Sequence, residues 1–214
     1  MPQYNFDIRF KTRVEKTPRV LEVAEGFGIG LADSEFVIYD NLKLTVKDGD
    51  VIYITGQSGS GKSLLLKALA AELEKRVFVS RLDEIELKDV PIIDQIGSTT
   101  AEALKLLARA GISDAFLFVR KPSELSDGQR YRVKLAKLLE SGAQVWVADE
   151  FGAVLDRETA KVIAFNMSRA ARDVGATLIV ATTHTDLKSE LAPTTTVTKH
   201  YRERLKVESD HDTE

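Results

Sequence analysis

Eight residues, 56–63, combine the residue types and the spacing needed to bind phosphate. They are Gly56, Gln57, Ser58, Gly59, Ser60, Gly61, Lys62 and Ser63. The glycines let backbone N–H groups close around phosphate oxygens, and a helix beginning here directs its positive N-terminus at the same anion. Lys62 can reach the terminal phosphates of a nucleotide, and Ser63 can offer a hydroxyl to magnesium. This Walker A pattern predicts a binding site for ATP and Mg²⁺.

The flanks of this motif predict a strand before it and a helix after it. Residues 51–55 are mostly apolar, and residues 64–74 have a helical pattern. A strand, a glycine-rich turn and a helix in this order are the context in which the motif binds phosphate. The alternative, a Gly- and Ser-rich turn without function, leaves both flanks unexplained.

Two adjacent carboxylates, Asp149 and Glu150, follow the apolar segment 145–148. Ligands bind at the carboxyl ends of strands in open α/β sheets. Asp149 can therefore hold magnesium through water, and Glu150 can polarise the water that attacks the γ-phosphate. An ordinary acidic pair at a strand end is the alternative, which the upstream phosphate motif disfavours. A further apolar segment ends at His184, which is either structural or a donor to a phosphate oxygen.

A second candidate anion site lies at Ser126, Gly128 and Gln129, which open a predicted helix over about residues 128–141. A serine hydroxyl and glycine N–H groups at a helix N-terminus favour phosphate. A single P-loop site rarely needs a second cradle so far along the chain. The sequence therefore predicts that this segment contacts a nucleotide held by another subunit, as in a head-to-tail homodimer.

These motifs and their order resemble those of the ABC ATPase superfamily, whose signature reads Leu-Ser-Gly-Gly-Gln. The resemblance covers roughly residues 27–184, and it departs from the signature at Asp127, which replaces the first glycine and puts a negative charge near the partner's phosphate. The resemblance implies a Mg²⁺-dependent ATPase, with an ABC-type core, that dimerises on binding ATP and separates after hydrolysis.

The same resemblance implies roles for further residues. Gln95 is similar in place to the glutamine that contacts magnesium and senses the γ-phosphate, and Asp156 to an aspartate that crosses the dimer interface. His184 is similar to the histidine that helps to place the attacking water. Phe27 has roughly the spacing of an aromatic residue that stacks on adenine. A core position is the alternative for Phe27, and Tyr39 is a second candidate for the base.

The elements that must position these residues predict an α/β fold of the P-loop NTPase type. Alternation over residues 4–10, followed by short apolar segments at 20–23, 36–39 and 42–46, predicts an antiparallel β-lobe within about residues 1–50. From residue 51 onward, apolar strands alternate with helices, which is typical of a mostly parallel sheet covered by helices.

The domain organisation follows from the same pattern. A short helical insertion is expected over about residues 95–140, starting near Thr99, and a later helix over residues 156–174. We expect residues 1–207 to form a single domain and the polar residues 208–214 to form a disordered tail.

Composition narrows the functional classes. The 214-residue chain has a formal net charge of −3 and a pI near 5.8, so no global charge indicates nucleic acid or an anionic membrane. It contains no cysteine, which excludes disulfides, thiolate zinc sites and a cysteine nucleophile. No apolar run is long enough for a spanning helix, and no signal peptide is evident, so we expect a soluble, cytoplasmic protein without membrane insertion.

Several outputs of such an ATPase stay open. It can be the nucleotide-binding subunit of a membrane transporter, although the helical insertion is short for that role. It can act on nucleic acid, for which the locally basic segment 199–206 is a candidate contact, although such a run is more often a solvated face. The favoured interpretation is a small stand-alone kind, similar to ABC ATPase domains found beside acetyltransferases in bacteria and phages. A non-hydrolysing switch is the remaining alternative.

Overall fold

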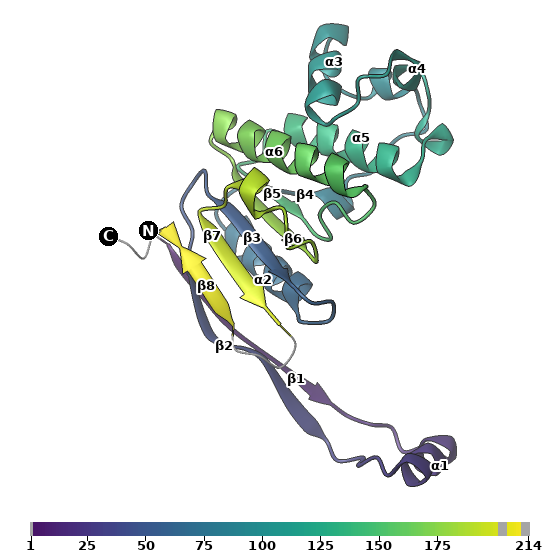
Figure 1. The fold of residues 1–214 in the computed structure, drawn as a ribbon, viewed down its shortest axis with the longest axis vertical. Coiled ribbons are helices and arrows are strands. Elements are labelled where there is room, and N and C mark those ends of the chain that lie inside the picture. Colours follow the sequence, from purple (N-terminus) through teal and green to yellow (C-terminus); the bar gives the residue numbers. More distant parts are fainter. Residues whose placement is uncertain (1, 201–204, 211–214) are drawn as a thin grey trace. The chain divides into compact units, whose positions relative to one another are not determined.

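The computed structural model describes residues 2–200 and 205–210, drawn in Figure 1. The chain divides into two compact units, Gln3–Leu44 and the rest of the described chain from Thr45 onward. This division falls near residue 45, somewhat before the expected end of the β-lobe at about residue 50. Residues 201–204 of the basic segment 199–206 and residues 211–214 of the expected tail lie outside the described residues.

The N-terminal unit is a two-stranded sheet of β1 (Gln3–Thr12) and β2 (Ser34–Thr45), joined through α1 (Pro18–Phe27). Figure 1 shows α1 at the far end of this hairpin, within its own unit. The predicted strand at residues 20–23 is therefore wrong, because these residues belong to α1. The Thr17 hydroxyl caps the helix by accepting from the amide of Val20, and Gly28 ends it with a φ of 62°.

A second correction concerns the segments 36–39 and 42–46, which were expected to be separate strands. They form the single strand β2, because the Asp40-Asn41 pair does not turn the chain. Asn41 instead takes a left-handed conformation, with a φ of 49°, inside the continuous strand. Asparagine tolerates this conformation better than other non-glycine residues.

The second unit is built on a six-stranded sheet with the order β4-β5-β6-β3-β7-β8. The pairs among β3 to β7 are parallel, and β8 runs antiparallel to β7. The strands are β3 (Val51–Gly56), β4 (Val79–Arg81), β5 (Val145–Ala148), β6 (Thr177–Thr182), β7 (Thr195–Lys199) and β8 (Lys206–Ser209). Because Glu208 and Ser209 belong to β8, the prediction that disorder begins at residue 208 is wrong.

Helices surround this sheet as the α/β pattern predicts. They are α2 (Lys62–Glu74), α3 (Thr100–Arg109), α4 (Ala115–Phe118), α5 (Asp127–Glu140), α6 (Arg157–Val174) and α7 (Lys188–Leu191), with 3-10 turns at Leu82–Glu84, Ile92–Asp94 and Pro122–Glu124. Helices α3 to α5 form the expected helical insertion. The Thr99 hydroxyl caps α3 by accepting from the amide of Glu102, so the predicted start of this helix is confirmed.

The core of this unit lies against the central strands. All residues of β3, β5 and β6 are buried, as expected of parallel strands covered on both faces. One apolar cluster joins alternate strand residues such as Tyr53, Trp146 and Leu178 to buried residues of α3, α5 and α6. Among the described residues, no helix has both the length and the apolar character needed to cross a membrane. The rigid central strands fix the ends from which the candidate site is built.

Candidate functional site

The phosphate-binding motif forms the turn between β3 and α2. Gly61 is the N-cap of α2, and no side chain caps this helix end, so its first N–H groups can turn to an anion. Gly56 has a φ of 140°, and a Cβ atom there would lie 1.8 Å from the backbone oxygen of Lys199 on β7. Only glycine fits at this position, so the start of the motif is set by the packing of the sheet.

The ends of three neighbouring strands open into one cavity of about 560 Å³. Its lining residues come from the turn after β3, the segment after β5 and the end of β6: Ser58, Gly59, Gly61, Lys62, Ser63, Leu64, Asp149, Glu150, Ala153, Ala181, Thr182 and Thr183. The structure therefore brings together the phosphate motif and both candidate carboxylates, although they are some 90 residues apart in the sequence.

Lys62 is held inside the phosphate motif. Its side chain is nearly buried, and its ammonium donates to the backbone oxygens of Gly56 at 3.0 Å and Gln57 at 2.7 Å. Burial lowers the pKa of Lys62, whereas the nearby charges of Asp149 and Glu150 raise it. The two carboxylates thus help to keep a cation at the base of the cavity.

The oxygen atoms near Lys62 match the needs of a magnesium nucleotide. The Ser63 hydroxyl donates to the Asp149 carboxylate at 3.0 Å, which places two hard oxygen ligands side by side. The Ser60 hydroxyl is buried and has no hydrogen-bond partner, although Ser60 is not among the residues that line the cavity. Within the described residues no cluster of three or more His, Asp or Glu can hold a metal. A metal here would therefore depend on phosphate oxygens and water for further ligands.

Glu150 lines the cavity, is exposed and has a strained backbone. Its φ of 47° is in the left-handed region that favours glycine. Its amide donates to the Asp149 carboxylate at 2.9 Å, and its backbone oxygen accepts from the amide of Ala153 at 3.0 Å. Strain of this kind persists where surrounding contacts fix the chain, and it gathers at functional sites.

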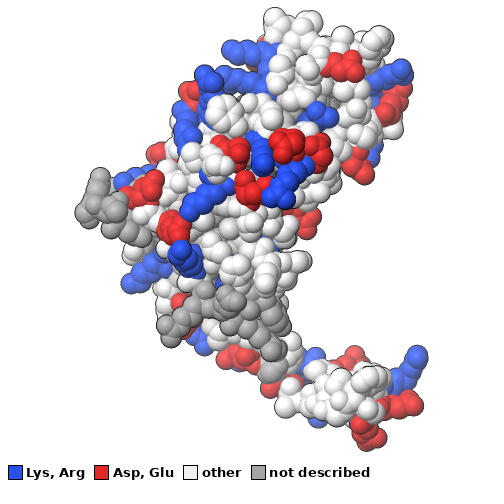
Figure 2. Space-filling model, in the orientation of Figure 1, with Lys and Arg blue, Asp and Glu red and all other residues white. Residues whose placement is uncertain are grey.

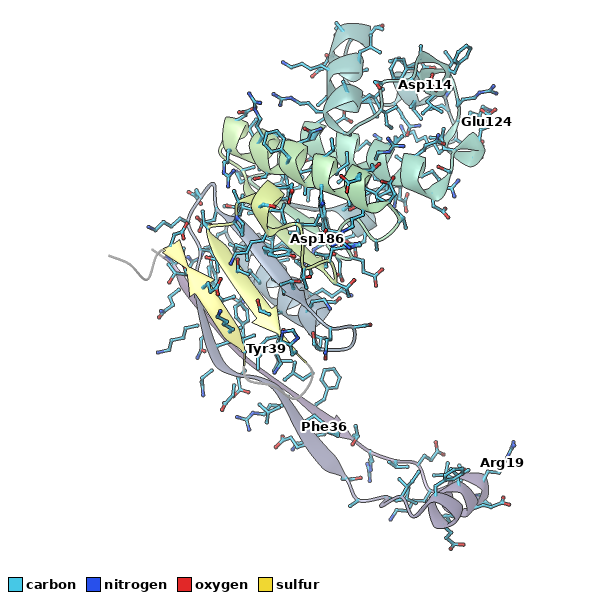
Figure 3. The ribbon with its side chains drawn as sticks, viewed as in Figure 1. Arg19, Phe36, Tyr39, Asp114, Glu124 and Asp186 are labelled. Atoms are coloured by element: carbon cyan, nitrogen blue, oxygen red, sulfur yellow. The ribbon has the colours of Figure 1, made fainter. Side chains whose placement is uncertain are left out.

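His184 follows β6 but is not among the lining residues, so its role in placing water stays a prediction. Its backbone is firmly held: its carbonyl accepts from the hydroxyls of Tyr53 and Thr55, and its amide donates to the Thr182 hydroxyl at 3.2 Å. Asp186, two residues after His184 (Figure 3), forms an ion pair with Arg157, the first residue of α6, with 2.7 Å between the charged atoms.

Tyr53 and Thr55, which support this loop, were not among the residues predicted from the sequence. Both lie in the otherwise apolar strand β3, where a buried hydroxyl must find a hydrogen-bond partner. That requirement was a usable signal, although the identity of the partner was not visible from the sequence.

Gln95 has other partners than the resemblance implies. Its side-chain amide accepts from the amide of Lys88 and donates to the backbone oxygens of Lys88 and Val90, all within 3.1 Å. It is not among the residues that line the cavity. In this conformation Gln95 closes its own loop, and its contact with magnesium stays a prediction.

The second anion site forms the N-terminus of α5. Ser126 and Gln129 make a reciprocal capping box, with the Ser126 hydroxyl 3.3 Å from the amide of Gln129. The Asp127 side chain is 80% exposed and is paired with Arg130, which offsets its charge. A Cβ atom at Gly128 would lie 3.2 Å from the backbone oxygen of Val154. None of these residues lines the cavity of their own chain.

Asp156 and Phe27 complete the set of predicted site residues. Asp156 is the N-cap of α6, where hydrogen bonds from Thr159 lower the pKa of its carboxyl. Its position across an interface stays a prediction. Phe27 ends α1 and is 80% exposed, so the alternative of a core position is wrong.

Tyr39, the second candidate for the base, lies on β2 (Figure 3) and is 2% exposed. Burial raises its pKa to about 12, and its hydroxyl has no hydrogen-bond partner. Of the two aromatic candidates, only Phe27 presents its ring to solvent in this structure. Stacking on adenine stays a prediction for either residue.

Fold and motifs agree on one class of protein. The described chain has the α/β fold of ABC-type ATPase domains. Residues 39–95 match the family model described as ABC transporter. At the level of structure, a dimeric post-hydrolysis state of the ATP-binding cassette MJ0796, bound to ADP and Pi, aligns with a TM-score of 0.63. That alignment covers 81% of this chain and 91% of the cassette at 20% identity, so it bears on the fold alone.

Curated relatives are transport proteins. The macrolide export ATP-binding/permease protein MacB of Burkholderia thailandensis is 29% identical over 188 residues, which cover 70% of this chain. The methionine import ATP-binding protein MetN 1 of Oceanobacillus iheyensis is also 29% identical over 188 residues, covering 71% of this chain. This chain spans 28% of MacB and 55% of MetN 1. The match to the family model is limited to residues 39–95.

Proposed function

We propose that this chain hydrolyses ATP with Mg²⁺ as a head-to-tail homodimer, in which each site joins the phosphate motif of one chain to the α5 N-terminus of its partner. The observation that carries this proposal is the shared cavity of Lys62, Ser63, Asp149 and Glu150, from which the second anion site is absent. A cavity with a cation, a metal-binding pair and a free carboxylate supports phosphoryl transfer to water.

The proposed site residues have distinct roles. Backbone N–H groups of residues 56–63 and the Lys62 ammonium bind the β- and γ-phosphates. Ser63 would hold Mg²⁺ directly and Asp149 through water. When bound, the metal neutralises charge on the phosphate oxygens. Gln95 would reach the same metal after its loop rearranges.

Glu150 is the proposed general base. Its exposed carboxylate can accept a proton from a water aligned with the γ-phosphate, and the imidazole of His184 would donate to a phosphate oxygen. The His184 backbone is held by hydrogen bonds and the Glu150 backbone takes a left-handed conformation, so the backbone from which each side chain extends is defined. Such pre-organisation is the main means by which proteins accelerate phosphoryl transfer.

The partner chain would complete the site. Ser126, Gly128 and Gln129 of the second chain would bind the γ-phosphate, and Asp156 would lie at the interface. ATP then holds the two chains together, and hydrolysis releases them. Phe27 is retained as the residue proposed to stack on adenine, because its ring is exposed.

The output of the cycle has two candidates. The short helical insertion and the α1 hairpin support the stand-alone kind, similar to domains found beside acetyltransferases. The printed names of the relatives support the other candidate, an ATP-binding subunit of a transporter. On the face seen in Figure 2, acidic and basic residues of the larger unit are intermixed, which gives no support there to nucleic acid binding.

Glu150→Gln is the test of this proposal. The variant should lose turnover by about 10²–10⁴-fold, the usual contribution of a general base, while it still binds ATP. With ATP and Mg²⁺ it should therefore accumulate as a dimer, measured by light scattering after size-exclusion chromatography. Glu72→Gln on α2 removes a carboxylate outside the cavity and serves as the matched control. Unchanged turnover in Glu150→Gln would refute the assignment of the base.

A further inference from the structure

The segment that follows Glu150 is fixed to two different parts of the larger unit. Phe151 is fully buried; its amide donates to the backbone oxygen of Ala181, and its own oxygen accepts from the Thr182 hydroxyl, both at 2.8 Å. These bonds attach the segment to β6. The next residue, Gly152, donates its amide to the Tyr131 hydroxyl at 3.0 Å. That bond attaches the same segment to α5.

Tyr131 is well suited to act as a fixed acceptor. It lies in the second turn of α5, five residues after Ser126, and its ring packs against the main apolar cluster. Burial raises the pKa of its hydroxyl, so the group stays neutral near pH 7. The ring cannot move without disturbing the cluster, and the position of its hydroxyl therefore follows the position of α5.

Because Gly152 lies close to Glu150 in the chain, the bond from its amide to Tyr131 also restrains the backbone of Glu150. Gly152 has a φ of 76°, and a Cβ atom there would lie 3.3 Å from the Cβ atom of Ala160, so a larger residue at this position would strain the segment. Glu150, two residues earlier, keeps a left-handed backbone that is unfavourable for glutamate. A strained residue keeps its conformation only when the contacts on either side of it determine the path of the chain.

We propose that Tyr131 is a positioning residue, which holds the Glu150 carboxylate through Gly152 and connects it to the helix that begins with Ser126. This inference rests on the proposed function, in which the N-terminus of α5 contacts the nucleotide of the partner chain. When the partner's nucleotide binds α5 and displaces it, the hydrogen bond between Tyr131 and Gly152 transmits that displacement to Glu150, the proposed general base of the chain's own site. The two sites of the dimer are then coupled within each chain.

Tyr131→Phe tests this inference, because it removes the hydroxyl and keeps the ring. The variant should lose about tenfold or more in kcat, while the KM for ATP stays within about twofold, since the phosphate motif is untouched. Hydrogen exchange at the Gly152 amide should become at least about tenfold faster. Gly152→Ala, which disturbs the same segment by steric contact instead, should also lower kcat.

Ser168→Ala is the matched control. Ser168 is 1% exposed, and its hydroxyl donates to the backbone oxygen of Leu191 at 2.6 Å, so this variant also loses a buried hydroxyl bond. It should lower the thermal midpoint without lowering kcat. A Tyr131→Phe enzyme with unchanged kcat and unchanged exchange at Gly152 would overturn the inference and leave the ATPase proposal intact. A wild type without Glu150-dependent hydrolysis would overturn both.

Discussion

The two anion sites of this chain differ in how completely the chain itself builds them. At residues 56–63, a nearly buried lysine and a serine bonded to Asp149 line one cavity. At the N-terminus of α5, the Ser126 and Gln129 side chains form a capping box, in which each accepts from the backbone amide of the other. The first site forms a cavity within one chain, whereas we propose that the second binds a nucleotide held by another chain.

Charge separates the two sites further. Helix α2 has no acidic residue in its first turn and begins with Lys62, whereas α5 carries Asp127 in its first turn. Arg130 pairs with Asp127 and offsets part of its charge. Because a negative side chain at a helix N-terminus competes with an anionic ligand, the second site should bind phosphate more weakly. We expect affinity to come from the first site and dimerisation to come from the second.

The largest effect is expected from Lys62→Ala. The ammonium is the main cation of the first site, and a hydrogen bond to a charged group contributes about 1.5–3 kcal/mol. The Kd for ATP should therefore rise by roughly 10- to 150-fold, measured by isothermal titration on dilute protein. Equal affinity in wild type and variant would contradict the assignment of residues 56–63 as the phosphate site.

Ser126→Ala should separate the two sites. The variant should bind ATP normally as a monomer, yet its turnover should fall by about tenfold, because one charged hydrogen bond to the partner's nucleotide is lost. Loss of the cap should also cost about 1 kcal/mol of stability. The measurement is an equilibrium titration beside a steady-state assay.

Mixing the two variants sharpens this test. A mixed dimer of Lys62→Ala and Ser126→Ala chains contains one intact composite site, made of the wild-type halves of both chains. An equal mixture should therefore hydrolyse ATP faster than either variant alone. A rate equal to the mean of the two variants would mean that each site is contained in one chain.

The smallest effect is expected from Asp127→Gly. Removing one exposed charge near a phosphate changes the interaction by about 1 kcal/mol in water, so the ATP-bound dimer should become roughly fivefold tighter. Analytical ultracentrifugation in the Glu150→Gln background measures this without hydrolysis. A weaker dimer would indicate that Asp127 takes part in binding rather than opposing it.

Local signals in the sequence were sufficient to predict many of the helices and strands of the larger unit. The predicted strand 145–148 matches β5, and the predicted helix 156–174 differs from α6 by one residue because Asp156 and Gly175 cap it at either end. In the hairpin unit the same kind of signal was present but overlooked: Thr17 and Pro18 open α1, while the apolar residues 20–23 favoured a strand.

The long-range hydrogen bonds that hold the loops of the site could not be predicted from local signals. The bond from Tyr131 to Gly152 joins residues 21 positions apart, and that from Tyr53 to His184 joins residues 131 positions apart. Spacing along the chain contains no sign of such partners, since they follow from how the strands and α5 pack. Gln95 shows the reverse case, in which a motif position was found but its contacts in this conformation were not.

The central claim is that the site is complete only when two chains meet, and the dependence of ATPase rate on protein concentration tests it most directly. The account predicts that the rate per chain rises with concentration until the dimer is saturated, and that Glu150→Gln abolishes it at every concentration. A rate per chain that stays constant down to concentrations at which the protein is monomeric would contradict the shared site.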